Sequence, residues 1–287
     1  MLQLRRSHPG WGAATIRADL RTDPVWAEQH LPRRARIAAS FKHAKLTRRY
    51  NRHTALPAPV PASAGRPHEV WELDAQGPVV VEHRGRVCLV NVIDTTSRLK
   101  VERDPCLDTT NPPRETYQRV VRRAFLATGL PRQLSFARGT VFFDHTTTSP
   151  VPTRLHVWLR SLGVAVRFTR VRRPTDHAHV ERVHQTMTLQ SLLGQSWPDG
   201  TALWAGLDAR RSMLNAHIPC RMLGGRAPLQ AYPEAGQSGR FYRPESETEL
   251  LDLNRVYAYL GTCRWFRRVA QNGSVAIGGI YYYINPK

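Results

Sequence analysis

The segment HEVWELDAQG, residues 68–77, opens the part of the chain in which predicted strands and helices alternate. Alternation along a strand places Trp71 and Leu73 on one face and Val70, Glu72 and Asp74 on the other. An acidic residue at the end of a central strand lies where the edge of a sheet opens to ligand. Asp74 is therefore a candidate site residue, although a lone aspartate at a strand end more often caps a turn.

The segments that follow predict an α/β domain around one mixed sheet. Two runs rich in Val, Leu and Ile, RVCLVNVI at 86–93 and RLKVER at 98–103, are joined by connections short enough for antiparallel pairing. Further along, we expect helices over 113–131, 152–163 and about 176–193, and strands over 133–136 and 164–168. Strands that alternate with helices in this way favour an α/β layout.

The first 54 residues predict a short basic helical domain. They hold 12 Lys and Arg against three acidic residues, a net charge of +9. Ile16 and Leu20, and then Ile37 and Phe41, recur at helical spacing. We favour a helix-turn-helix-like DNA-binding segment over a solvated pair of basic helices. Its candidate DNA-binding residues are Arg33, Arg34, Lys42, Lys45, Arg48 and Arg49. Residues 55–67, with four prolines, predict a semi-extended linker.

The C-terminal part, residues 247–287, predicts a small all-β unit, a partial β-barrel that stops before it would close. Its predicted strands are RVYAYLG, CRWFRRVA and SVAIGGIYYYI, with an Asn272–Gly273 hairpin turn between the last two. Arg267 and Arg268 lie among aromatic residues and are candidate DNA contacts. An ordinary barrel with a charged exterior accounts for them equally well.

The overall composition indicates a polyanionic partner. The 287 residues include 42 Lys and Arg against 22 Asp and Glu, a net charge of +20 with a pI near 11.0. Only four of the cationic residues are Lys; arginine suits bidentate phosphate contacts, although coding bias gives the same skew. An Arg-rich RNA-binding protein accounts for the charge but not for the order of the motifs. Four widely spaced cysteines and the lack of a long apolar run favour a cytoplasmic protein outside the membrane.

The order of several motifs resembles the integrase-like DDE transposases of bacterial insertion sequences, within the retroviral integrase catalytic core superfamily. The motifs are WELDAQG, VNVIDTTSR, LSFARGTVF, LGVAV and RPTDHAHVERVHQT, and the resemblance continues to GGRAPLQAYP, so that the core spans residues 68–235. The flanking segments resemble the family's helix-turn-helix region and its small β-barrel. The resemblance implies a ribonuclease-H-like, mixed five-stranded sheet with flanking helices, and a nucleoid-associated protein of the bacterial cytoplasm.

The resemblance also implies a catalytic site of two aspartates and one glutamate that hold two Mg²⁺ or Mn²⁺ ions. The first aspartate corresponds to Asp74 and the glutamate to Glu181, both metal ligands. The second aspartate should lie two residues before Gly139, where the chain has Ala137. Alanine cannot bind a metal, so we expect impaired DNA cleavage and strand transfer. A catalytically inactive, decayed or repurposed DNA-binding protein is the alternative.

The family's partners are DNA, as terminal inverted repeats and target DNA, and further copies of the chain in a homo-oligomer. The candidate phosphate contacts beside the site are Arg170, Arg172 and Arg173.

Other ligands near the site are less favoured. Asp144 and Asp94 are alternatives to the lost aspartate, but we expect Asp94 to cap the turn after its strand. His177, His179 and His184 surround Glu181, yet zinc usually needs four well-placed ligands.

Overall fold

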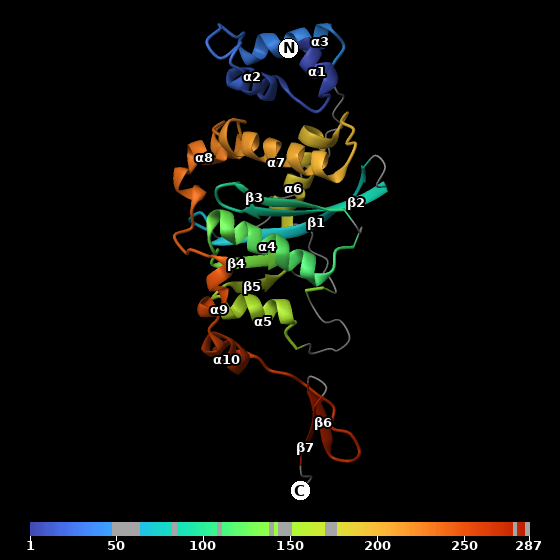
Figure 1. The fold of residues 1–287 in the computed structure, drawn as a ribbon, viewed down its shortest axis with the longest axis vertical. Helices are drawn as coiled ribbons and strands as arrows, with labels where there is room; N and C mark the ends of the chain where they lie inside the picture. The colour runs from blue at the N-terminus through green and yellow to red at the C-terminus, as the bar shows by residue number, and fades with distance from the viewer. Residues whose placement is uncertain are drawn as a thin grey trace.

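The computed structural model of the chain describes residues 1–47, 64–81, 85–107, 111–137, 141–142, 151–169, 177–277 and 280–284. The strands of its main sheet are β1 (Val70–Val81), β2 (Gly85–Asp94), β3 (Lys100–Cys106), β4 (Gln133–Phe136) and β5 (Ala165–Phe168), in the order β3-β2-β1-β4-β5. β1, β2 and β3 pair antiparallel, whereas β1, β4 and β5 pair parallel (Figure 1). The predicted mixed five-stranded sheet is confirmed.

Several residues named above lie outside the described part of the chain. They are Arg48, Arg49, Asp144, Arg170, Arg172, Arg173 and, within the predicted linker, residues 55–63.

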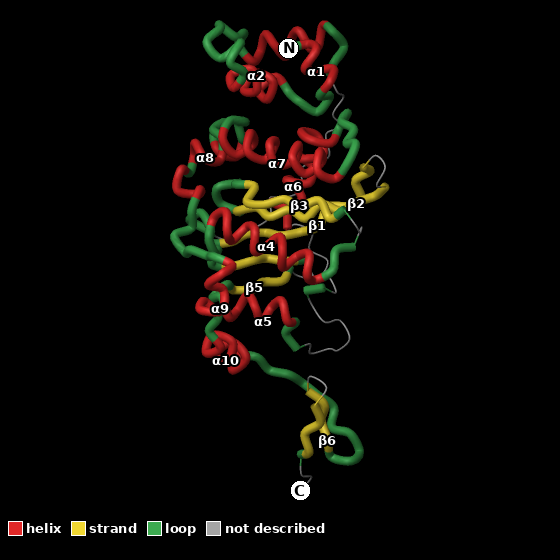
Figure 2. The backbone as a smooth tube through the Cα atoms, viewed as in Figure 1, coloured by secondary structure: helices red, strands yellow, loops and turns green. Residues whose placement is uncertain are grey.

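The two faces of the sheet are covered by different helices. The hydrophobic core on one face joins β1 to α4 (Arg114–Thr128) and α5 (Arg154–Ser161), and Trp71 and Leu73 are fully buried in it. The core on the other face joins β2 to α6 (Ala178–Met187) and α7 (Gly200–Ala216). Figure 2 shows the strands lying between these helical layers. The middle of the sheet is thereby shielded from water, whereas β5 and the second half of β1 are partly exposed. Asp74, expected at the end of its strand, lies inside β1, because the strand continues to Val81.

Two features of the second helical layer differ from the sequence expectation. The predicted helix over about 176–193 is α6 followed by a π-helical turn, η2 (Thr188–Leu192). No element was predicted where α7 forms, although the Asp199 side chain caps it by accepting a hydrogen bond from the Ala202 N–H at 2.8 Å.

The N-terminal head, residues 1–47, is helical. It consists of α1 (Leu2–Ser7), α2 (Ala13–Thr22) and α3 (Arg34–His43), around a small core of its own. Ile16, Leu20, Ile37 and Phe41, which were selected by their helical spacing, are all buried there. Their burial confirms the predicted apolar faces.

The head docks on the core through the ring of Trp11. The indole N–H of Trp11 donates to the Gln190 carbonyl at 2.8 Å, within the π-helical turn η2. The guanidinium of Arg210, on α7, lies 3.8 Å from the centre of the same ring and donates to the Gln190 side chain at 2.7 Å. Asp19 lies 3.6 Å from Arg210 across the interface. A buried arginine is thus held between an aromatic face and a carboxylate, a geometry that favours cation–π stacking.

The head and the core also approach closely at Gly10. A Cβ atom at Gly10 would lie 1.5 Å from the Leu189 carbonyl oxygen, so no larger residue fits without backbone movement. A Cβ at Gly12, two residues on, would meet nothing within 4 Å.

The C-terminal part corrects the sequence prediction. Residues 247–262, expected to contribute strands, form the helices α9 (Glu247–Leu250) and α10 (Leu253–Thr262). The side chain of Asp252 caps α10. Val256, Tyr259 and Leu260 recur at helical spacing and pack toward α5, and this packing favours a helix although the apolar residues also alternate as in a strand. Residues 263–270 form no strand.

The described part of the predicted barrel is a two-stranded sheet. It pairs β6 (Ser274–Ile277) with β7 (Ile280–Tyr283). The Asn272–Gly273 turn is present, because the Gly273 N–H donates to the Ala270 carbonyl at 2.9 Å, but it precedes β6 and does not join two strands.

Replacement of Gly10 by alanine should loosen the head. We expect Gly10→Ala to lower the free energy of unfolding by about 1–3 kcal/mol, because the added methyl overlaps the Leu189 carbonyl. Amide hydrogen exchange at η2 and α7 should accelerate. Gly12→Ala is the matched control: it weakens the N-cap of α2 but should leave hydrogen exchange at η2 and α7 unchanged. Equal acceleration of exchange by the two variants would contradict this docking.

Candidate active site

The candidate site is built on the polar face of β1. Glu72 and Asp74 alternate with the buried Trp71 and Leu73, as predicted. Gln76 continues the same face, which contacts α6. The alternation of β1 therefore separates a hydrophobic face, which packs on α4, from a polar face, which contacts the helix that carries Glu181.

Glu72 and Gln76 hold α6 against β1. The Glu72 carboxylate accepts from the Val180 N–H at 2.9 Å and lies 2.8 Å from the His179 Nδ1. No side chain of α6 caps its own N-terminus. Glu72, on the neighbouring strand β1, therefore satisfies a backbone N–H group that would otherwise lack an acceptor. At the other end, Gln76 donates to the Thr188 hydroxyl at 2.6 Å. These two contacts fix the position of α6 along β1.

Asp74 and Glu181 are brought together by this arrangement. Burial raises the pKa of Asp74 to about 6, and the nearby charge of Glu181 adds to that rise. Glu181 is exposed, and its pKa is raised by partial desolvation and by the charge of Glu72. The negative charge of Glu181 disfavours the ionised form of Asp74, and a bound cation would offset that repulsion.

Ala137 lies beside Asp74 at the end of the neighbouring strand. The last paired residues of β1 and β4 are Leu73 and Phe136; Asp74, still within β1, and Ala137, the first residue after β4, come next along the chain. Glu72, two residues before Asp74, is already bonded to α6. Among the described residues, no three His, Cys, Asp or Glu side chains converge as a metal site.

The alternative ligands have structural roles. Asp94 is fully buried and caps its turn as predicted, accepting from the Thr96 N–H at 2.7 Å and the Ser97 N–H at 3.2 Å. His179 binds Glu72, and the His177 Nε2 lies 3.4 Å from the Ser135 hydroxyl. Burial, with the charge of Arg103, lowers the pKa of His184 to about 4.

Arg103 is a buried cation that no motif in the sequence indicates. In the sheet register Asp74, Asn91 and Arg103 lie in one row across β1, β2 and β3. The Arg103 Nε donates to the Asn91 side chain at 2.8 Å, but its two terminal nitrogens have no hydrogen-bond partner. Burial lowers the pKa of Arg103 to about 9. The only sequence signal was an arginine within a β-strand, which does not reveal its burial.

The predicted DNA-binding residues of the described chain lie in two places. Arg33, Arg34, Lys42 and Lys45 are exposed on or beside α3. Arg267 and Arg268 lie in the irregular segment that leads to β6, where Arg267 is half-buried and Arg268 exposed.

Comparison with known proteins gave structural similarities at low sequence identity. No model of a known protein family matches the chain. A chain of the simian T-cell lymphotropic virus intasome in complex with PP2A regulatory subunit B56 gamma is 14% identical, with a TM-score of 0.47 over 77% of this chain and 74% of that one.

Two integrase catalytic core domains align over a shorter part. The core of BIV integrase is 16% identical, with a TM-score of 0.39 over 58% of this chain and 95% of that one. The core of HTLV-2 integrase in complex with magnesium is 15% identical, with a TM-score of 0.41 over 58% of this chain and 97% of that one.

Within the part of the chain that the structure describes, no helix has the length and apolarity needed to span a membrane.

Glu72→Gln should detach the start of α6. The amide can present only one acceptor oxygen where the carboxylate presents two, and we expect a loss of about 1–3 kcal/mol in the free energy of unfolding. Urea denaturation and hydrogen exchange at the Val180 amide measure the effect. Glu249→Gln, an exposed control, should change neither quantity. Unchanged exchange at Val180 would contradict the proposed cap.

Asp74→Asn should stabilise the metal-free protein in a pH-dependent way. Because the pKa of folded Asp74 lies near 6, above its unfolded value, ionising this carboxylate costs folding free energy once the pH rises through 6. Below the unfolded pKa that cost is absent. We therefore expect the gain in unfolding free energy to grow from near zero at about pH 4 to about 1–3 kcal/mol at about pH 7.5.

Urea denaturation in the presence of EDTA, at both pH values, measures this gain. Asp23→Asn, on the surface of the head, serves as the control. A gain that is equal at the two pH values would contradict the burial of an ionised Asp74.

Proposed function

We propose that this chain is a DNA-binding protein of the transposition and integration type, whose catalytic core has lost one metal-binding carboxylate at Ala137. The observation that carries the proposal is that Asp74 on β1 lies within electrostatic reach of Glu181 on α6, and that Ala137 directly follows the last residue of β4, which pairs with Leu73. Phosphodiester chemistry of this class uses carboxylates at such a position. An RNA-binding protein would account for the charge but gives no reason for this convergence.

The donor set fits one divalent ion better than two. Mg²⁺ is commonly bound through one or two carboxylates together with substrate phosphates, and Mn²⁺ accepts the same oxygen ligands. Asp74 and Glu181 would hold one such ion, which would supply positive charge opposite a DNA phosphate. The methyl group of Ala137 offers no oxygen for a second ion, and we derive no two-metal step for this chain.

The charge distribution supports DNA as the partner. The net charge of the chain is +20, and the exposed cations of α3 belong to the head, where helix-turn-helix-like DNA binding is proposed. Terminal inverted repeats and target DNA are the proposed substrates. The joining of two DNA ends requires more than one copy of the chain, so we extend the proposal to a homo-oligomer on DNA.

A second candidate is a DNA-binding protein without catalysis. The observation that favours it is again Ala137, because the loss of one of three ligands removes several kcal/mol of transition-state stabilisation.

Restoration of the carboxylate tests the proposal. We expect Ala137→Asp to nick supercoiled plasmid DNA with Mn²⁺ roughly 100-fold faster than the unmodified protein, because a third oxygen ligand then lies beside Asp74. Ala137→Asn, of the same shape but without charge, should show no such gain. Adding Asp74→Asn to Ala137→Asp should abolish the new activity, which excludes a contaminating nuclease.

Two outcomes would overturn parts of the proposal. A folded Ala137→Asp variant without any gain would overturn the assignment of the site. Nicking by the unmodified protein as fast as by Ala137→Asp, and abolished by Asp74→Asn, would show that Ala137 does not impair catalysis.

A further inference from the structure

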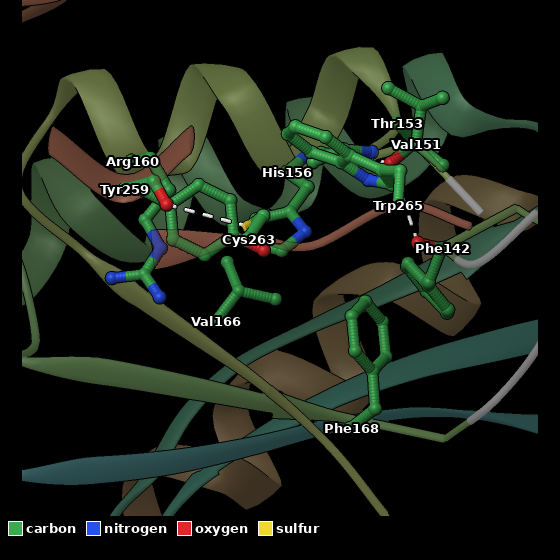
Figure 3. Close-up of a pocket in the computed structure, with 11 residues that line it drawn as sticks. Phe142, Val151, Thr153, His156, Arg160, Val166, Phe168, Tyr259, Cys263 and Trp265 are labelled. Atoms are coloured by element: carbon green, nitrogen blue, oxygen red, sulfur yellow. Dashed lines mark hydrogen bonds between the residues drawn. The ribbon is translucent and has the colours of Figure 1, made fainter. Parts of the chain in front are cut away.

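A cavity separate from the Asp74 site opens between α5, β5 and the segment after α10. Its volume is about 180 Å³ (Figure 3). His156 and Tyr259 face it from the two helices, Phe168 from β5, and Trp265 from the irregular segment. A cavity of about 150 Å³ holds one benzene ring, so this one accommodates a single flat ring.

The wall of the cavity holds a buried polar atom that has no partner and is closed off from the cavity itself. The side chain of His156 is 6% exposed, and its Nε2 makes no hydrogen bond. Burial, assisted by the charge of Arg160, lowers the pKa of His156 to about 4, so the ring is neutral near pH 7. Buried polar atoms are nearly always hydrogen-bonded in folded proteins.

A cation lies at the same cavity. The guanidinium of Arg160 stands 4.2 Å from the centre of the Tyr259 ring, and its buried Nε also lacks a hydrogen-bond partner. An occupant that carries an anionic group next to a flat ring matches this arrangement, because arginine binds phosphate oxygens and stacks on aromatic faces at once.

The cavity is linked to the candidate active site by aromatic packing. Phe142, which lines the cavity, stacks on Phe136 with ring centres 4.5 Å apart. Phe136 ends β4 and immediately precedes Ala137. A DNA strand that leaves the duplex near Ala137 would therefore pass close to the cavity.

We infer that this cavity binds one unpaired nucleobase, a pyrimidine by its size, from a DNA strand held at the neighbouring site. The inference rests on the proposed function. The base would stack between Trp265 and Phe168, and Arg160 would contact its phosphate. Stacking of this kind tolerates different sequences, since every base has an aromatic face.

Binding of the full chain to two matched DNA ligands tests the inference. One ligand is a duplex with a short unpaired end of thymidines, and the other carries abasic nucleotides there, so that the phosphates are identical and only the base differs. We expect the thymidine end to bind roughly 5- to 150-fold more tightly. Trp265→Ala should remove the difference, because it removes one wall of the cavity, and should leave binding of the abasic ligand unchanged.

Two further variants separate the cavity from general effects. Phe266→Ala, at a neighbouring and 78% exposed residue that does not line the cavity, should keep the preference for thymidine. Cys263→Phe, which fills the cavity from its own wall, should abolish it.

Equal affinity of the unmodified protein for the two ligands would overturn this inference and leave the proposed DNA binding intact. Failure to bind either ligand would overturn the proposed function itself. Equal losses for both ligands in Trp265→Ala would assign Trp265 to a phosphate contact and would also overturn the inference.

Discussion

The contact between the Glu72 carboxylate and the first turn of α6 positions the candidate site. Carboxylates are favourable at helix N-termini because they satisfy free N–H groups and complement the helix dipole. Here the carboxylate comes from β1, so it ties a strand to a helix that is more than 100 residues away in the chain. Glu181 follows Val180 directly, and Asp74 lies two residues after Glu72. One contact therefore sets the separation of the two acidic residues on which the proposed function depends.

The polar face of β1 comes at an energetic cost. Asp74 is held in a setting that raises its pKa, and Arg103 is buried with two unpartnered nitrogens in the same row of the sheet. Neither group gains stability from its position, since a buried charge without full hydrogen bonding opposes folding. The hydrophobic face of the same strand, with Trp71 and Leu73, offsets this cost. Buried charged groups with perturbed pKa values are common at functional sites, where a ligand supplies the compensating charge.

Local patterns predicted most of the core but not its long-range contacts. The strand at 133–136 forms at its predicted residues, because a short β-rich run between turn signals has few alternatives. The segment that forms α10 was predicted as a strand, since its apolar residues also alternate; packing against α5 selected the helix. No sequence pattern predicted the contact between Trp11 and Arg210, because neither residue type indicates a partner 199 positions away.

The sequence by itself determined the order of β1–β5 with α4, α5 and α6, the two faces of β1, the basic head and the presence of alanine at position 137. These follow from periodicity, charge and residue type, which are local properties. The tertiary structure alone decided that Glu72 caps α6, that Arg103 is buried, and that His156 and Trp265 enclose a cavity. Such features depend on which surfaces come into contact when the chain folds. Burial then changes the hydrogen bonding and the pKa of side chains whose residue type alone does not distinguish them.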